Sequence, residues 1–430
     1  MDPILSEKLK SLEVKIDSCF PETLNSVKIG LAVAAVLSFK NNLQPTTLIY
    51  SGPSGSGKTL PLGFMLPKKG HKNITNYVYR CDNFTPKAFV SHAANIKAAN
   101  LSNIDLLPKI KMRLLVTKEL APVFRGKQDE LIDKFSILIS VLDGKGLVTS
   151  SGSRGTRGYY DPINFCWLGA TTPLSNETHR LMSQLGTRLL FYGTARKEKT
   201  VDDLLSFARR NDNTLLEEDC RELTNDFLEH LFKTYPPGSL DVNRIEFDDA
   251  LLRKLVLYAK TMATLRAFFT SKEGDQAGND RYGKPQKENE ERAIIILKNI
   301  ALGSALINNR DYVDDYDLSQ IKHICLSSMP EMRRLTFEAL LKCNGCAKTG
   351  RLMELTQFSR PTTIYYMKEL GHLGICTYEE ASKGGASSIV LKDQYYELLA
   401  DSTDQGKDES DDDFQPKAVK QSGGVSDEGC

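Results

Sequence analysis

The most constraining feature of this sequence is a glycine-rich segment directly after a short apolar run. Residues 46–59 read TTLIYSGPSGSGKT, and their last eight residues fit the pattern G-x-x-x-x-G-K-[ST]. Glycines in this pattern let backbone N–H groups turn toward a phosphate, while the lysine reaches the β- and γ-phosphates and the hydroxyl binds Mg²⁺. We therefore predict an ATP·Mg²⁺ site in which Lys58 and Thr59 have these roles, with a helix beginning near Gly57.

The predicted nucleotide-binding residues are Gly52, Pro53, Ser54, Gly55, Ser56, Gly57, Lys58 and Thr59. A glycine- and serine-rich surface turn is the alternative interpretation of this loop.

Short apolar strands alternate with helical stretches through the segment that contains this loop. The strand candidates are residues 47–50, 76–79, 113–117, 164–170 and 188–192. Such alternation is typical of a parallel sheet that helices cover on both faces. We therefore predict an α/β fold whose parallel sheet carries the phosphate loop.

Composition and charge suggest how the rest of the chain is organised. We predict five parts: N-terminal helices (1–44), an α/β core (45–198), a helical unit (199–330), a unit of helices and strands (331–400), and a disordered acidic tail (401–430). The tail holds nine acids and three lysines, so its net charge is −6, and the preceding 400 residues carry +7. This mild positive bias is compatible with a polyanionic partner.

The nine cysteines are scattered along the chain, and their odd number indicates reduced thiols rather than a disulfide framework. Cys343 and Cys346 form a close pair, and a zinc site that adds His372 and Cys376 is the alternative there. The N-terminus is polar, and the longest apolar run, residues 29–39, is too short to span a bilayer. We expect a cytoplasmic protein with no membrane partner.

Two further strands end in residues suited to phosphoryl transfer. Residues 111–119, KMRLLVTKE, end in Glu119, which we expect to orient water and to help Thr59 hold the metal. Lys118 stands where a second acid is usual, and a buried strand with a solvated Lys–Glu end is the alternative. A later strand ends in Thr172, which we expect to hydrogen-bond the γ-phosphate or the attacking water.

Arg188 opens the last apolar strand of the core. An arginine presented from there to a neighbouring subunit would neutralise charge as the phosphoryl group leaves. A local salt bridge is the alternative.

The order of these segments resembles the AAA+ ATPases, and within them the clade that contains the minichromosome-maintenance (MCM) helicases. The resemblance covers about residues 22–330, and the layout is similar to MCM-like ATPases of mobile elements. It implies an ATPase core with a helical lid, ATP and Mg²⁺ as cofactors, and a homo-oligomeric, hexameric ring. It also implies that Arg292 is a second sensor arginine. Lys118 departs from the family pattern and leaves the hydrolysis rate open.

The same resemblance extends to a segment between the strands that end in Glu119 and Thr172. Residues 147–165 fall where this clade inserts a β-hairpin that points into the central pore of the ring. The resemblance implies that Arg154 and Arg157, in a Gly/Ser-rich tip, contact the DNA backbone. A solvent-facing hairpin is the alternative.

Residues 331–400 resemble a winged helix-turn-helix. We predict helices over 332–342, 348–356 and 359–370, and wing strands over 373–378 and 387–391, with Ser359 and Pro361 as the start signal of the third helix. In such folds the third helix enters the major groove of DNA. The predicted DNA-contact residues are Arg360, Thr362, Thr363, Tyr366 and Lys368. A winged helix used for protein contacts is the alternative.

Together these patterns predict an ATP-dependent, DNA-associated motor, a helicase or translocase in DNA replication. A nucleotide-switched DNA-binding regulator or loader with slow or no hydrolysis is the first alternative. A scaffold that binds nucleotide but no DNA is the second.

Overall fold

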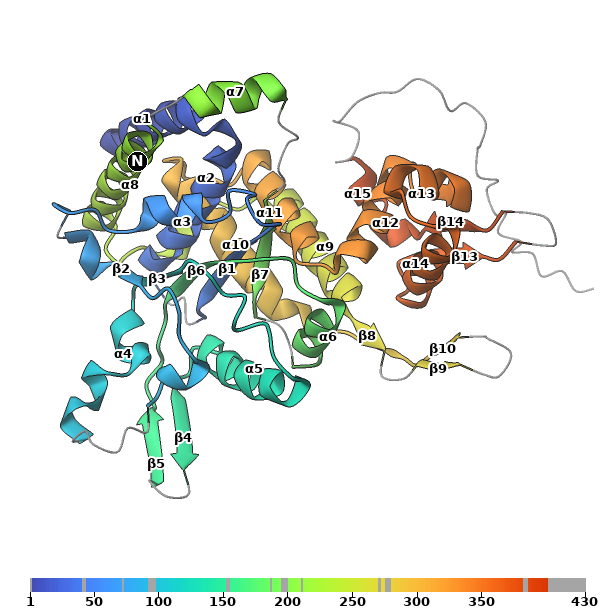
Figure 1. Cartoon of the computed structure of the whole chain (residues 1–430), viewed down its shortest axis with the longest axis horizontal. Helices are drawn as coiled ribbons and strands as arrows, with labels where there is room; N and C mark the ends of the chain where they lie inside the picture. The colour runs from blue at the N-terminus through green and yellow to red at the C-terminus, as the bar shows by residue number, and fades with distance from the viewer. Residues whose placement is uncertain are drawn as a thin grey trace, which may run out of the picture.

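A parallel five-stranded sheet lies at the centre of the computed structural model (Figure 1). The strands are β1 (Thr46–Ser51), β2 (Val78–Arg80), β3 (Leu114–Thr117), β6 (Cys166–Thr171) and β7 (Leu190–Gly193). Their spatial order is β2-β3-β6-β1-β7, and all four neighbouring pairs run parallel. Each strand overlaps a predicted one, which confirms the expected α/β fold with a parallel sheet and a phosphate loop.

The structure describes most of the chain. The described residues are 2–40, 44–71, 73–91, 98–151, 155–185, 188–194, 200–209, 212–269, 272–274, 280–381 and 386–400. The acidic tail that we predicted over 401–430 lies outside the described residues.

Side chains of successive strand residues alternate between the two faces of the sheet, as β geometry requires. In β1, Leu48 and Tyr50 join one buried cluster and Ile49 joins another. The first cluster includes residues of α2 (Leu24–Ala35), α3 (Leu60–Met65) and α10 (Glu290–Ile307). The second includes residues of α4 (Leu106–Ile110), α5 (Gln128–Leu142) and α6 (Asn176–Leu185). Helices therefore cover both faces, as the alternating sequence pattern predicts.

The N-terminal helices pack into the body of the protein. α1 (Pro3–Cys19) lies along α8 (Asn213–Thr234), and α2 lies between the sheet and α10 (Figure 1). The α2–α10 approach is close because Gly303 has no side chain: a Cβ there would stand 2.3 Å from the carbonyl oxygen of Ala32. The N-terminal helix α2 is therefore packed against α10, although the two are far apart in the sequence.

The helical unit that follows the core consists of α7 (Val201–Arg209), α8, α9 (Asp249–Arg266), α10 and α11 (Asp315–Ser327). Residues 271–291, between α9 and α10, are polar and contain three glycines, a composition typical of a loop. The structure instead has two paired ribbons there, β8 (Phe268–Phe269) with β11 (Pro285–Gln286) and β9 (Lys272–Gly274) with β10 (Asp280–Tyr282). Cross-strand backbone hydrogen bonds define these ribbons, and composition does not report such pairing.

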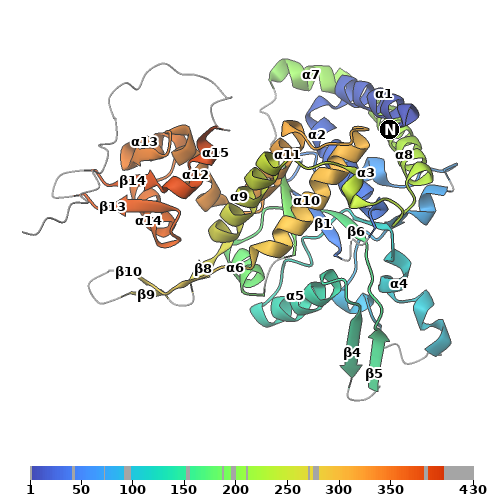
Figure 2. The same cartoon turned by 180° about the vertical axis from the view of Figure 1, so that it is seen from behind.

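The C-terminal unit combines helices with a three-stranded antiparallel sheet of order β12-β14-β13. Its elements are α12 (Glu331–Lys342), β12 (Cys346–Lys348), α13 (Thr349–Thr356), α14 (Arg360–His372), β13 (Cys376–Glu379), β14 (Ser388–Leu391) and α15 (Glu397–Ala400). Strand β12 was not predicted, because three residues next to a turn give no periodic signal. In both views the C-terminal unit lies beside α9 and the ribbon of β9 and β10 (Figure 2).

A hairpin of β4 (Leu147–Ser151) and β5 (Gly155–Tyr159) projects away from the sheet (Figure 1). Within the part of the chain that the structure describes, no helix is both long and apolar enough to cross a membrane. No three His, Cys, Asp or Glu side chains of those residues come together in a group that could hold a metal ion.

His179 on α6 gives a pH-dependent contribution to stability. Burial, with smaller effects of the positive charges of Arg266 and Arg333, lowers its pKa from 6.5 to about 4. Between these two values the unfolded chain binds a proton that the folded chain does not, so stability is lost as the pH falls. We expect the free energy of unfolding to drop by about 2 kcal/mol between about pH 7.5 and pH 5 on account of this residue. Urea unfolding at both pH values measures the drop.

The control for this prediction is His179→Gln, which cannot titrate in this range. Burial also lowers the pKa of His323, so the wild-type drop contains more than one histidine. An equal drop in His179→Gln and in the wild type would contradict the assignment to His179.

Candidate active site

The loop after β1 has the backbone conformation that its glycines predict. Gly55 and Gly57 have φ of 77° and 78°, in the region that disfavours other residues. No heavy atom lies within 4 Å of where a Cβ of Gly57 would stand. Among the described residues, the backbone N–H groups of Gly57, Lys58 and Thr59 have no hydrogen-bond acceptor. The loop therefore offers unpaired donors beside open space, which fits a phosphate group.

The last residue of β6 and the residue after β7 contact the two ends of this loop. Gly52 N donates to Thr171 O over 3.3 Å, and Thr194 N donates to Ser51 O over 2.8 Å. The hydroxyls of Ser56 and Thr194 are 2.9 Å apart. A Cβ on Gly52 would stand 2.4 Å from Thr194 Oγ1 and 2.9 Å from Thr194 O, so only glycine allows this approach.

Lys58 lies inside the loop, with 7% of its surface exposed and its Nζ donating to Pro53 O over 3.1 Å. Helix α3 begins at Leu60, three residues later than the start expected near Gly57. Pro61 is the reason, because it has no N–H to donate to the carbonyl of Gly57, four residues before it. The residues from Gly57 to Thr59 therefore remain a turn.

Parallel pairing brings the other predicted catalytic residues to the same edge of the sheet. Ser51 of β1 is level with Thr171 of β6, and Thr117 of β3 is level with Gly169. Glu119 is the second residue after β3 and Thr172 is the first after β6, so both lie with the phosphate loop at the carboxyl ends of three neighbouring strands. Glu119 is exposed, and its Oε1 accepts a hydrogen bond from Ala121 N over 2.8 Å.

The structure places Arg125, which no sequence pattern singled out, beside Thr172. Arg125 Nη2 donates to Thr172 Oγ1 over 3.2 Å. Lys134 of α5 fixes the loop that carries it, donating to the backbone carbonyls of Arg125 and Pro122 over 2.8 Å and 3.3 Å. Five residues of loop separate Arg125 from Glu119, and no sequence spacing indicates the contact between Arg125 and Thr172.

Arg188 lies at the other end of the strands, where β1 and β7 begin. It precedes β7, and its carbonyl accepts a hydrogen bond from Thr47 Oγ1 near the start of β1. Thr194, which touches the phosphate loop, is six positions further along the chain than Arg188. At about 3.3 Å per residue this is about 20 Å, a distance that an arginine side chain does not cover. Arg188 therefore cannot reach the phosphate loop of its own chain.

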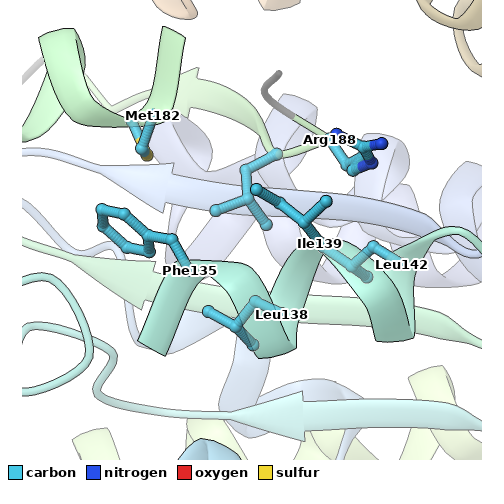
Figure 3. Close-up of a pocket in the computed structure, with 7 residues that line it drawn as sticks. Phe135, Leu138, Ile139, Leu142, Met182 and Arg188 are labelled. Atoms are coloured by element: carbon cyan, nitrogen blue, oxygen red, sulfur yellow. The ribbon is translucent and has the colours of Figure 1, made fainter. Parts of the chain in front are cut away.

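Arg292, from the first turn of α10, lies next to Arg188. Both arginines pair with Asp143, the residue that caps the C-terminus of α5. Arg188 Nε is 2.8 Å and Arg292 Nη1 is 3.1 Å from Asp143 Oδ1. Arg188 also lines an apolar pocket, together with Leu142 of α5 and Met182 of α6 (Figure 3). The two arginines that the sequence singled out separately thus share one carboxylate.

The expected DNA contacts of the hairpin are placed only in part. Arg154 lies outside the described residues. Arg157 belongs to strand β5, and its prediction as a residue of the tip was wrong because the strand pairing continues past it to Gly155. Its Nη2 donates to Asp105 over 2.9 Å, and its Nη1 donates to the Ser91 carbonyl.

Asp105 ties the hairpin to the connection between β2 and β3. It is fully buried and also accepts hydrogen bonds from Tyr159 Oη and Ser91 N, each over 2.8 Å. Burial, followed by the bond to Asp105, raises the pKa of Tyr159, so the phenol stays protonated. The base of the hairpin is therefore fixed by buried polar contacts.

On α14 one of the five predicted DNA contacts was wrong. Thr363 is fully buried, because it shares the inner face of the helix with Met367 and Leu370. Its hydroxyl donates to Ser359 O over 3.0 Å. Arg360 at the start of the helix is exposed.

The remaining three candidates of α14 are partly exposed and already have partners. Thr362 takes part in the cap with Ser359, their hydroxyls being 2.8 Å apart. Tyr366 packs against Phe358, with ring centroids 6.3 Å apart, and Lys368 pairs with Glu380 over 2.9 Å.

No model of a known protein family matches this chain, and no curated protein matches it in sequence. The solved structures that are similar to this chain in part include the following two. One is a candidate ATPase from Cytophaga hutchinsonii, with 14% identity, a TM-score of 0.36, and coverage of 75% of this chain and 89% of the other. The second is a full-length MCM homolog from Methanopyrus kandleri, with 11% identity and a TM-score of 0.39. This match covers 77% of this chain and 63% of the homolog. Similarities of this size do not establish a family.

The contact between Gly52 and β7 can be tested by adding one methyl group. We expect Gly52→Ala to weaken ATP binding about tenfold or more, because the new Cβ would push the loop away from Thr194. Titration of the purified protein with a fluorescent ATP analogue measures the loss.

Gly63→Ala in α3 is the matched control. No atom lies within 4 Å of its Cβ position and its φ is helical, so we expect unchanged ATP binding and a gain of about 0.5–1 kcal/mol in stability. Equal ATP affinity in Gly52→Ala and in the wild type would show that the loop does not need this close approach.

Proposed function

We propose that this protein is an ATPase of the AAA+ kind, which hydrolyses ATP·Mg²⁺ at the contact between subunits of a homo-oligomeric ring. The observation that carries the proposal is the gathering of the phosphate loop, Glu119 and Thr172 at one edge of the parallel sheet. The order of these features along the chain, followed by a helical unit, is the order that the AAA+ resemblance requires.

The residues of this edge divide the work of hydrolysis among them. Residues 52–59 would hold the phosphates through backbone N–H groups and Lys58, and Thr59 and Glu119 would hold Mg²⁺. Bound Mg²⁺ neutralises phosphate charge, and ATP supplies the γ-phosphoryl group. Glu119 orients the attacking water, and Thr172, which Arg125 holds in place, contacts the γ-phosphate.

A second subunit completes this site. Arg188 lies about 20 Å from its own phosphate loop, so it can act on a phosphate only if a neighbouring chain brings that phosphate to it. Arg292 lies beside it at Asp143 and would act with it. Each subunit would then give a phosphate loop to one site and two arginines to the next, an arrangement that repeats around a closed ring such as a hexamer.

The proposed work of this cycle is on DNA, as a helicase or translocase in replication. The C-terminal unit supports DNA binding: its element order is helix, strand, two helices and two strands, with Arg360 exposed at the start of α14. This is the order of a winged helix-turn-helix, whose third helix enters the major groove. The projecting β4–β5 hairpin supports a second contact with DNA.

Lys118 favours the second candidate function, a DNA-binding regulator or loader in which ATP sets assembly and turnover is slow. In this function Glu119 is the sole acid after β3, without the second acid that would help to hold the metal. Hydrolysis rates with and without single-stranded DNA distinguish the two candidates, because a motor accelerates on DNA and a switch does not.

Complementation between two inactive variants tests the shared site. We expect Lys58→Ala and Arg188→Ala each to lose ATP hydrolysis when alone. Mixing them in equal amounts should restore about a quarter of the wild-type rate, because a quarter of the contacts then pair an intact loop with an intact arginine. Phosphate release measures the rate.

The control mixture contains Lys58→Ala and the double variant Lys58→Ala/Arg188→Ala, which has no intact loop and should stay inactive. Full activity of Arg188→Ala by itself would contradict a site shared between subunits.

A salt titration tests the DNA contact of α14. Arg360→Ala should weaken DNA binding without regard to sequence, because an exposed arginine releases a counterion when it meets a phosphate. We expect the slope of log K against log salt to fall by about 0.9. Arg253→Ala, an exposed arginine of α9, serves as the control and should leave the slope unchanged.

A further inference from the structure

Asp143 is the point at which the core and the helical lid are joined by charge. It caps the C-terminus of α5, while Arg188 precedes β7 and Arg292 belongs to the first turn of α10. A single oxygen, Oδ1, takes both contacts, over 2.8 Å and 3.1 Å. All three side chains reach solvent: 30% of Asp143, 12% of Arg188 and 35% of Arg292 is exposed.

The position of this carboxylate is unfavourable by itself. The last carbonyls of a helix carry partial negative charge, so an acid at the C-terminus is repelled by its own helix. The two arginines offset this repulsion. The cluster as a whole has a formal charge of +1, and it therefore still attracts an anion from outside.

We propose that Asp143 is an internal competitor for phosphate, which holds Arg188 and Arg292 in the isolated subunit and yields them to the nucleotide of the adjacent subunit. The inference rests on the proposed function, because it requires that these arginines act on a neighbour's nucleotide. It adds a regulatory role for a residue that contacts no nucleotide of its own chain.

Electrostatics give the direction of the effect. An approaching phosphate is attracted by two arginines and repelled by Asp143, so neutralising Asp143 changes the formal charge of the cluster from +1 to +2. Subunits with a neutral residue at position 143 should therefore associate through ATP more readily. The effect should fade in high salt, because the cluster is exposed to screening ions.

Asp143→Asn isolates this effect, because the amide keeps an oxygen that accepts from both arginines while the charge is lost. ATP hydrolysis is measured over a range of protein concentrations, in low and in high salt. We expect the protein concentration that gives half-maximal specific activity to fall about fivefold in low salt, with a smaller difference in high salt.

Asp133→Asn is the matched control, since Asp133 is an exposed acid of the same helix. It changes the net charge equally and should leave the half-maximal concentration unchanged.

The outcomes separate this inference from the function on which it rests. A wild-type protein that hydrolyses no ATP at any concentration would overturn the proposed function. A wild-type protein whose specific activity does not change with protein concentration would behave as an isolated subunit. This result would overturn both the shared site and the role of Asp143. Normal concentration dependence, with Asp143→Asn unchanged or shifted to higher concentration, would overturn the inference alone.

Discussion

The parallel pairing of β6 with β1 on one side and with β3 on the other decides where the phosphate loop, Glu119 and Thr172 lie. Because neighbouring strands run in one direction, their carboxyl ends meet at one edge, and Gly52, Glu119 and Thr172 follow three of these ends. The same pairing fixes the end of β7, whose Thr194 meets the phosphate loop. A shift in register by one residue would reverse the side chains of a strand between the two cores and separate these groups.

The direction of the strands also places the phosphate loop and Arg188 at opposite ends of the sheet's strands. The phosphate loop lies at the carboxyl edge, and Arg188 lies before the amino end of β7, next to the start of β1. A rigid parallel sheet cannot bring these two ends together. Under the proposed function, one chain would therefore carry a phosphate loop for one shared site and two arginines for another, and in this structure Asp143 pairs with both arginines.

The core could be predicted from local sequence patterns, whereas contacts between segments far apart in the sequence could not. The five strands follow from apolar runs with β-branched residues, and the loop conformation follows from Gly55 and Gly57. Arg125 and Asp143 carry no pattern of their own, since what they do depends on Thr172 and Arg292, which lie far from them in sequence. Thr363 was misplaced because the helix was expected from its cap, and the buried face of a helix is set by what packs against it.

Arg333 of α12 connects the C-terminal unit to α9. It donates two parallel hydrogen bonds to Glu369 of α14, and it also donates to the carbonyls of Leu265 and Ala267 at the end of α9. These contacts link α14 to α9 of the helical unit through an ion pair whose two side chains are nearly buried. Without the C-terminal unit, the carbonyls of Leu265 and Ala267 at the end of α9 would lose the donor that Arg333 supplies, while Arg333 and Glu369 belong to the same unit and would stay paired.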